Sequence, residues 1–262
     1  MKILALHTDI IECAGILPEN ASLSECTDTS GFEGFVVADD SAAGIPNVFA
    51  SAGTIGKFEH IIVEKMAAES QLDRLKSCSS KYPVLAMALD GRGFHGQHGR
   101  PWMTGIGNLY LSIYLPAVDL GRIRLDKDAP DLYKVGDYLS DLETNDLFAS
   151  ADVYTRLQMM PCMAVYKALK KMGISPALRY PNDIIIYIDN QPHKIAGCLT
   201  EISVRGDTIL SVRFGIGLNV GFAPDVYGTG LHTTCVCRFV PDATVGRCCR
   251  MVCEEIELRT KL

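Results

Sequence analysis

The spacing of apolar and polar residues predicts mainly strands in the first half of the chain. Short apolar runs broken by Gly, Ser, Asp and Pro fill the first sixty residues, as in Phe35-Val36-Val37-Ala38, and favour strands and turns over helices. Apolar residues at loose helical spacing predict an amphipathic helix over residues 63–76. Continuous apolar runs at 84–89 and 109–115 then predict two buried strands.

The second half of the chain predicts two helices and three consecutive strands. A long helix with one apolar face begins near Val153 and ends at Gly173, with Pro161 kinking it or starting its second half. Residues 184–188, 195–202 and 209–214 predict strands joined by short polar links, after a polar surface excursion at 119–145. The pattern favours an antiparallel meander with helices packed on one face of a mixed, mostly antiparallel sheet, an α+β fold.

Composition narrows the class of protein. With 262 residues, 48% of them hydrophobic, the chain can bury one sizeable core. A net charge of −6 argues against a nucleic-acid partner, which requires an excess of basic residues on one face. No apolar run reaches the roughly 18 residues of a membrane span, and the charged first residues do not resemble a secretion signal. We therefore expect a soluble cytoplasmic protein that does not bind membranes, with a mitochondrial location left open.

The ten cysteines are expected to be reduced and mostly buried, because a chain of this size folds without disulfides. One cluster near the C-terminus offers a zinc-site alternative, but it lacks C-x-x-C spacing: Cys235, Cys237, Cys248, Cys249 and Cys253. Residues 249, 252, 253 and 256 instead fall at helical spacing. This indicates the apolar face of a last helix, capped by Asp242.

The richest chemistry lies in residues 90–102, which read Asp-Gly-Arg-Gly-Phe-His-Gly-Gln-His-Gly-Arg-Pro-Trp directly after a predicted strand. Glycines let backbone N–H groups approach an anion, and arginine offers a fork of donors suited to phosphate or carboxylate. The spacing fits neither a P-loop nor a dinucleotide-binding motif, and a flexible surface loop is the alternative. His95 and His98 are predicted to be solvated loop residues rather than metal ligands, because no third ligand lies near them.

Two further runs carry polar groups at strand ends. Asn182 and Asp183 precede one predicted strand, and Lys194 opens the next, so a hairpin would bring carboxylate and ammonium into one site. A simple turn is the alternative for this first run. The run Gly215-Ile216-Gly217-Leu218-Asn219 ends the following strand and could admit a flat ring or a ribose against bare backbone, or could be a β-bulge.

In this order the three runs resemble the catalytic domain of biotin protein ligases, in the biotin/lipoate protein ligase-like family. That pattern is Gly-Arg-Gly-Arg-x-Gly-Arg-x-Trp, Lys-Trp-Pro-Asn-Asp, Lys-hydrophobic-Ala-Gly and Gly-x-Gly-x-Asn. The closest agreement is in Pro181-Asn182-Asp183 and Lys194-Ile195-Ala196-Gly197, and the similarity extends from residue 83 to the end.

The resemblance implies a class II synthetase-like α+β fold and an enzyme that uses ATP and Mg²⁺. Biotin would be joined to AMP and then transferred to a lysine of an acceptor, such as a biotin carboxyl carrier domain. The resemblance also implies a catalytic domain at 61–262 behind an N-terminal strand-and-turn extension at 1–60. We expect no small C-terminal β-barrel and no DNA-binding domain, and a homodimer is left open.

The resemblance also implies roles for individual residues. The cationic catalysts would be Lys194, Arg92 and Arg100. The acid and the adenylate would be held by Gly91, Arg92, Gly93, Gly99, Arg100, Trp102, Lys194 and Gly197. The nucleotide and metal side would consist of Asn182, Asp183, Gly215, Gly217 and Asn219, with Asp183 as the Mg²⁺ ligand. A plain core aromatic is the alternative for Trp102.

Several departures from the family pattern fall on the acid and adenylate sites. Phe94 stands in place of the second arginine of the loop, and no glutamine precedes the loop. The family's Ser-Thr-Asn run, which helps bind the biotin ring, is expected at Val63-Glu64-Lys65-Met66, which carries no hydroxyl or amide. Two alternatives therefore stay open: a lipoate or octanoate ligase or transferase of the same fold, and a catalytically impaired ligand-binding homologue.

Overall fold

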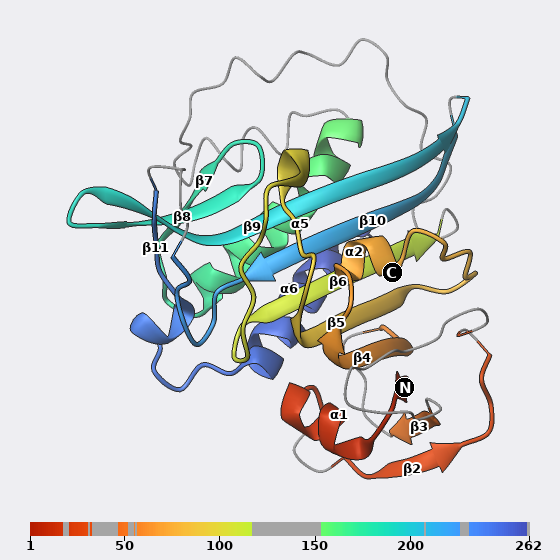
Figure 1. Cartoon of the computed structure of the whole chain (residues 1–262). Helices are drawn as coiled ribbons and strands as arrows, with labels where there is room; N and C mark the ends of the chain where they lie inside the picture. Colours follow the sequence, from red (N-terminus) through yellow and green to blue (C-terminus); the bar gives the residue numbers. More distant parts are fainter. Residues whose placement is uncertain are drawn as a thin grey trace.

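A computed structural model describes residues 1–17, 21–30, 32, 47–51, 55, 57–116, 153–206, 208–225 and 231–260. In these residues one eleven-stranded sheet runs through the molecule (Figure 1). Its strands are β1 (Lys2–Ala5), β2 (Leu23–Cys26), β3 (Asn47–Ser51), β4 (His60–Ala67), β5 (Val84–Gly91), β6 (Leu109–Pro116), β7 (Pro176–Arg179), β8 (Asp183–Ile188), β9 (Gln191–Arg205), β10 (Thr208–Leu218) and β11 (His232–Thr233).

The sheet is mixed and mostly antiparallel. Its order is β2-β3-β1-β4-β5-β6-β10-β9-β8-β7, with β11 beside β9. The pairs β1–β4, β4–β5 and β9–β11 are parallel, and the other pairs are antiparallel. The predicted meander is confirmed as β8-β9-β10, and the α+β fold class is confirmed with it.

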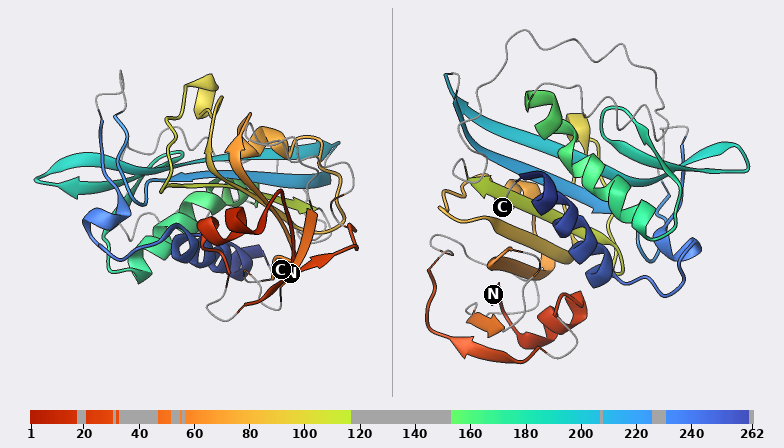
Figure 2. Two further views of the ribbon diagram at one scale, coloured as in Figure 1. Left: turned by 60° about the horizontal axis from the view of Figure 1, so that its bottom comes forward. Right: turned by 180° about the vertical axis from the view of Figure 1, so that it is seen from behind.

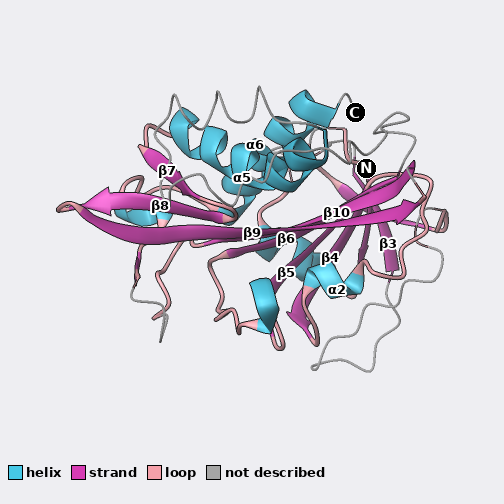
Figure 3. Cartoon of the chain, turned by 90° about the horizontal axis from the view of Figure 1, so that it is seen from above, coloured by secondary structure: helices cyan, strands magenta, loops and turns pink. Residues whose placement is uncertain are grey.

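Helices lie on both faces of the sheet, in unequal amounts. The helices α1 (Thr8–Ala14), α5 (Val153–Lys171) and α6 (Val245–Thr260) cover one face, as Figure 2 shows. The short helix α2 (Gln71–Arg74) lies on the opposite face together with the glycine-rich loop and its 3₁₀ turn η1 (Gln97–Gly99) (Figure 3). A second 3₁₀ turn, η3 (Val236–Arg238), precedes α6. The three-helix face carries most of the core, and the α2 face is left open for a site.

The predicted helix at 63–76 is wrong. Residues His60–Ala67 form β4, which runs parallel between β1 and β5 and is almost continuously buried. Only α2, four residues long, follows it. A central parallel strand has both faces covered, so its apolar run carries no alternation that would distinguish it from a buried helix.

Three other local predictions need correction. The first sixty residues contain the helix α1 in addition to strands. The strand β7 was not predicted. The cap of the last helix is Thr244, whose hydroxyl accepts from the Arg247 N–H at 3.2 Å, while Asp242 only pairs with the Arg247 side chain at 3.7 Å. Either residue type can cap a helix, and where the chain turns decides which one is in position.

The other predicted elements agree with the structure. Residues 84–89 and 109–115 lie in β5 and β6, and α5 runs through Pro161 to Lys171 as one helix. The face of α6 formed by residues 249, 252, 253 and 256 is buried as expected. The predicted strand at 35–38 and the excursion at 119–145 lie outside the described residues.

The N-terminal strands belong to the same sheet as the rest of the described chain. β1 pairs with β4 over Lys2–His60, Ile3–Ile61 and Leu4–Ile62. All ten cysteines are free thiols, and five of them are buried: Cys162, Cys198, Cys248, Cys249 and Cys253. Among the described residues, no helix is long and apolar enough to cross a membrane.

Candidate functional site

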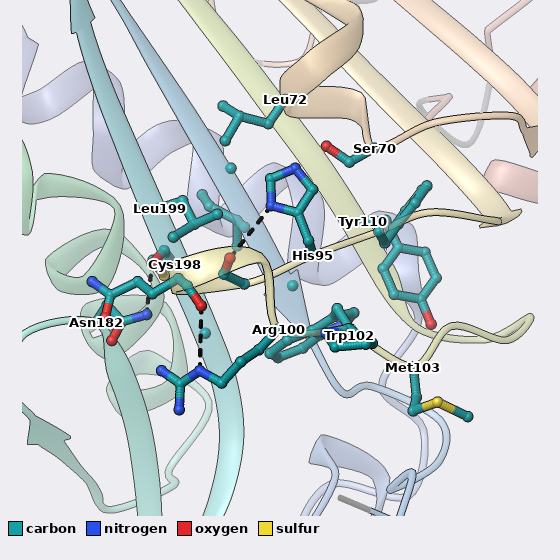
Figure 4. Close-up of a pocket in the computed structure, with 18 of the residues that line it drawn as sticks. Ser70, Leu72, His95, Arg100, Trp102, Met103, Tyr110, Asn182, Cys198 and Leu199 are labelled. Atoms are coloured by element: carbon teal, nitrogen blue, oxygen red, sulfur yellow. Dashed lines mark hydrogen bonds between the residues drawn. The ribbon is translucent and has the colours of Figure 1, made fainter.

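A cavity of about 380 Å³ lies on the α2 face of the sheet. Its floor is formed by β6, β9 and β10, and its rim by α2, the start of β8 and the glycine-rich loop (Figure 4). Cavities of a few hundred Å³ suit a small-molecule ligand. Several loop and strand ends that were predicted to carry chemistry meet here.

Lys194 and Asp183 form an ion pair at the cavity. The Nζ atom of Lys194 lies 2.6 Å from Oδ1 of Asp183, and the two side chains are only 18% and 16% exposed. Antiparallel pairing of β8 with β9 brings them together across eleven residues of sequence. β11 pairs with the other edge of β9, with Thr233 opposite Lys194. The backbone of Lys194 is therefore held by β8 on one edge and by β11 on the other. The predicted hairpin and the predicted proximity of the two charges are confirmed.

The indole of Trp102 lies flat against a cross-strand pair of glycines. Gly197 of β9 faces Gly217 of β10. A Cβ atom at Gly217 would be 2.6 Å from Trp102 Cζ2, and one at Gly197 would be 2.8 Å from Cζ3. Only glycine leaves room for the ring at these two positions. The flat ring that covers the bare backbone of Gly217 in this structure is therefore the chain's own tryptophan.

Trp102 also contacts Lys194. The ammonium of Lys194 lies 5.0 Å from the centre of the indole ring, within the range of a cation–π contact. The indole N–H is buried and has no hydrogen-bond partner among the described residues. Trp102 is thus a wall of the cavity rather than a plain core aromatic.

The glycine-rich loop folds back on itself as a short hairpin. The Gly96 N–H donates to the Arg100 carbonyl at 2.7 Å, and the Trp102 N–H donates to the Phe94 carbonyl at 2.8 Å. Phe94 is buried and packs edge-on against Tyr110, with ring centres 5.4 Å apart. The phenyl group at the position of the family's second arginine therefore anchors the loop to β6.

Asparagine side chains at the ends of the strands form hydrogen bonds with backbone groups. The Asn182 amide donates to the Cys198 carbonyl at 3.1 Å, and the Asn219 amide donates to the Thr234 carbonyl at 3.1 Å. Asn108 accepts from three consecutive N–H groups at residues 220–222. The Asn108 bonds hold the chain after β10 against the start of β6.

Nine of the residues predicted for the site line the cavity: Arg100, Trp102, Asn182, Asp183, Lys194, Gly197, Gly215, Gly217 and Asn219. Four do not, namely Gly91, Arg92, Gly93 and Gly99. Arg92 is exposed, and its backbone N–H donates to the Ala67 carbonyl at 2.9 Å. Gly91 is the last residue of β5, and the exposed Arg92 and Gly93 follow it outside the cavity lining.

The four residues expected to stand near the start of a helix, in place of the family's Ser-Thr-Asn run, do not lie there. Val63-Glu64-Lys65-Met66 lies inside β4, and the helix that follows, α2, begins at Gln71 after its N-cap Ser70. Ser70, Gln71 and Leu72 line the cavity, so this wall does offer a hydroxyl group and an amide residue. Ser70 caps α2 by accepting from the Asp73 N–H at 3.2 Å. The Ser-x-x-Asp spacing is a helix-start signal that could have located this segment.

His95 is not the solvated residue that was predicted. Its Nε2 atom lies 2.7 Å from Oδ2 of Asp73 on α2, and the imidazole lines the cavity. His98, by contrast, is exposed and does not line it. Asp73 is twenty-two residues away in sequence, and no local pattern announces the contact.

Burial raises the pKa of two groups that line the cavity, the Tyr110 phenol and the Cys198 thiol. It raises the pKa of Tyr110 to about 12, and the phenol donates to the Gly105 carbonyl at 3.1 Å. Burial, together with the neighbouring Cys162, also raises the pKa of the Cys198 thiol. Both groups are neutral at physiological pH. The charged side chains that line the cavity include Lys194, Arg100 and Asp183.

Comparisons with known proteins give a structural match. No family model matches the chain, and no curated protein matches its sequence. The chain is similar in structure to the biotin protein ligase from Aquifex aeolicus in complex with biotin and ATP, with a TM-score of 0.51 and 20% identity over 78% of this chain and 73% of that chain. It is also similar to the biotin protein ligase from Leishmania major in complex with biotinyl-5-AMP (TM-score 0.50, 19% identity, 78% and 76% covered).

A third similar structure is a mutant of the Aquifex aeolicus enzyme in complex with biotin, with a TM-score of 0.51, 22% identity and 78% and 71% of the two chains covered. Identities near 20% establish the fold. The chain has the α+β fold of the biotin protein ligases, and the activity has to be argued from the cavity itself.

Proposed function

We propose that this chain is an ATP-dependent ligase of the biotin protein ligase type, which activates a carboxylic acid as its adenylate and passes the acyl group to a lysine of an acceptor protein. The observation that carries the proposal is the Lys194–Asp183 ion pair at 2.6 Å, placed on the cavity beside the indole of Trp102. Its position on a fold shared with biotin protein ligases supports the assignment.

The first step would use the cations of the cavity. The carboxylate oxygen of the acid attacks the α-phosphorus of ATP, a new O–P bond forms, and the bond to pyrophosphate breaks. Negative charge moves onto the phosphoryl oxygens and the leaving pyrophosphate during this step. The Nζ atom of Lys194 and the guanidinium of Arg100 are donors that can stabilise this charge where it develops.

In the second step the amine of an acceptor lysine attacks the acyl carbon of the adenylate. The new amide bond forms, AMP leaves, and the attacking nitrogen loses a proton to solvent. The exposed side chain of Met103, which follows Trp102 in the loop, also lines the cavity (Figure 4). A biotin carboxyl carrier domain is the acceptor that fits this proposal.

Magnesium would enter with the nucleotide. Mg²⁺ prefers oxygen ligands and is commonly held by one or two carboxylates together with substrate phosphates. Asp183 and Asp225 both line the cavity, and the described residues contain no cluster of three or more His, Cys, Asp or Glu side chains that could hold a metal ion. This donor set fits a magnesium ion held mainly by phosphate, with Asp183 as the protein ligand, and such an ion would supply further charge neutralisation.

Biotin is the acid that we propose as substrate. The walls combine apolar side chains, such as Leu72 and Leu199, with the hydroxyl groups of Ser70 and Ser112. A ureido ring requires hydrogen-bond partners, whereas the dithiolane ring of lipoate and the alkyl end of octanoate do not. The polar groups contributed by the α2 wall therefore favour biotin over the two apolar acids.

The test is acyl-AMP formation, detected by mass, with biotin, lipoate or octanoate in the presence of ATP and Mg²⁺. We expect biotinyl-AMP and pyrophosphate. An adenylate formed only from lipoate or octanoate would transfer the proposal to those acids. Calorimetric binding of an acid without adenylate formation would instead identify a ligand-binding protein and overturn the proposed activity.

A further inference from the structure

His95 and Asp73 connect two walls of the cavity that are far apart in sequence. His95 lies in the glycine-rich loop, and Asp73 lies in α2. Their side chains are 30% and 17% exposed, and the distance from Nε2 to Oδ2 is 2.7 Å. A short bond between partly shielded groups is the kind of polar contact that can hold a loop in one place.

Both partners are themselves held in position. The Asp73 carboxylate also accepts from the Ser70 hydroxyl at 3.1 Å and from the Lys76 ammonium. Burial acts to raise the pKa of Asp73, but hydrogen bonds from Lys76, His95 and Ser70 outweigh it and hold this pKa below its usual range. The carboxylate is therefore charged at physiological pH and bound from three sides.

The imidazole of His95 faces acceptors at both ring nitrogens. Nε2 faces Asp73, and Nδ1 lies 3.3 Å from the Gly96 carbonyl. Histidine can donate from a ring nitrogen to the Asp73 carboxylate, and a side chain without a donor at this position cannot make the contact.

The rest of the loop is attached by apolar and aromatic contacts. Phe94 packs on Tyr110 at one end, and Trp102 packs on Gly197 and Gly217 at the other. His95 lies between them, so the polar contact with Asp73 joins the intervening hairpin to α2. Ser70, Leu72 and His95 all line the cavity, and this contact therefore closes one of its walls.

We propose that His95 and Asp73 form a latch that holds the glycine-rich loop against α2 and so shapes the cavity before any ligand binds. His95 is a positioning residue in this role: it keeps Trp102 and Arg100 at the cavity and does not take part in bond making. The inference rests on the proposed function only for its kinetic readout, because the latch itself can be measured in the ligand-free protein.

The chain contains one tryptophan, Trp102, and it lies in the loop, so its fluorescence reports on loop position. We would measure acrylamide quenching of Trp102 in ligand-free His95→Ala and Asp73→Asn. We expect the quenching constant to rise about twofold, because a locally opened loop exposes the indole. His98→Ala, in the same loop but exposed and off the cavity, is the matched control and should behave as the parent.

Three comparisons separate a latch from a general loss of structure. His95→Gln can still donate to Asp73, so its quenching should fall between parent and His95→Ala. The double variant His95→Ala/Asp73→Asn should quench no more than the stronger single variant, because the two side chains act as one unit. If His95→Ala quenches like His98→Ala, the latch does not exist.

Kinetics give a second, independent readout. If adenylate formation is established, we expect His95→Ala to raise the KM for the acid about tenfold and to leave kcat within about twofold, because a lost charge-assisted hydrogen bond weakens the closed cavity rather than the chemistry. A fall in kcat with unchanged KM would overturn the positioning role. Failure of adenylation with every acid would count against the proposed function and leave the quenching result intact.

Discussion

At the scale of single residues, the decisive arrangement is one ammonium held by one carboxylate in a small cavity. Lys194 is only 18% exposed, and its Nζ atom lies 2.6 Å from Asp183 and 5.0 Å from the centre of the Trp102 indole. A lysine in this setting is preorganised to meet negative charge on a substrate, because its position is already set before the reaction begins. Lys194 contributes little to the hydrophobic core, so its chemical role can be tested apart from folding.

Lys194→Ala should reduce adenylate formation by about a thousandfold, the scale expected when a preorganised charge that stabilises the transition state is removed. The midpoint of thermal unfolding should change by only a few degrees. Pyrophosphate release and calorimetry would measure the two effects. Lys81→Ala, an exposed lysine that does not line the cavity, is the control. Near-parental turnover in Lys194→Ala would remove this residue from the mechanism.

At the scale of elements, the site depends on how the glycine-rich loop packs on β9 and β10. β9 and β10 place Gly197 opposite Gly217, and the indole of Trp102 fills the space that two side chains would occupy. Neither position has a backbone conformation that requires glycine. The two glycines are needed here because the indole ring occupies the space of a side chain. The strand pair and the loop are therefore one structural unit.

Gly217→Ala should displace the indole, because the added methyl would lie 2.6 Å from Cζ2 of Trp102. We expect a shift of Trp102 emission and a loss of about 1–3 kcal/mol of stability, as for other overpacked sites. Gly96→Ala is the matched control in the loop, because its nearest contact would be an ordinary 3.8 Å. Unchanged emission and unchanged stability in Gly217→Ala would show that the indole does not rest on this strand in solution.

At the scale of the whole molecule, one sheet joins the N-terminal strands to the strands of the site. Ile3 of β1 is fully buried, and the strand order leads from β1 through β4, β5 and β6 to β10. Side chains of β1, β6 and β10 belong to a single hydrophobic cluster. We therefore expect the described chain to unfold as one cooperative unit rather than as an extension followed by a domain.

Ile3→Ala should lower the free energy of unfolding by about 2–5 kcal/mol, the usual cost of this truncation in a core. The loss should be the same by far-UV circular dichroism and by Trp102 fluorescence, although Trp102 packs on β9 and β10, which β4, β5 and β6 separate from β1. Ile106→Ala, with a side chain that is 74% exposed, is the matched control and should be nearly neutral. If the unfolding transition followed by Trp102 fluorescence is the same in Ile3→Ala as in the parent, the first strands fold separately.

Much of the architecture was predictable from local patterns. The strands β5, β6, β8, β9 and β10 and the helices α5 and α6 follow from apolar periodicity and from their bounding Gly and Pro residues. The proximity of Asp183 and Lys194 follows from a short hairpin, whose register depends on neighbouring residues only. The one large error, at residues 63–76, arose where a strand buried on both faces has no period to read.

The sequence by itself therefore determined the α+β class, the meander and the residues of the lysine–carboxylate pair, because each depends on interactions between near neighbours in the chain. Only the tertiary structure decided that Arg92 does not line the cavity, that Trp102 covers the glycine pair, and that His95 reaches Asp73. These three outcomes depend on how the loop packs on distant elements. Packing of that kind is decided by the shapes of all the surfaces that meet, and no single segment carries that information.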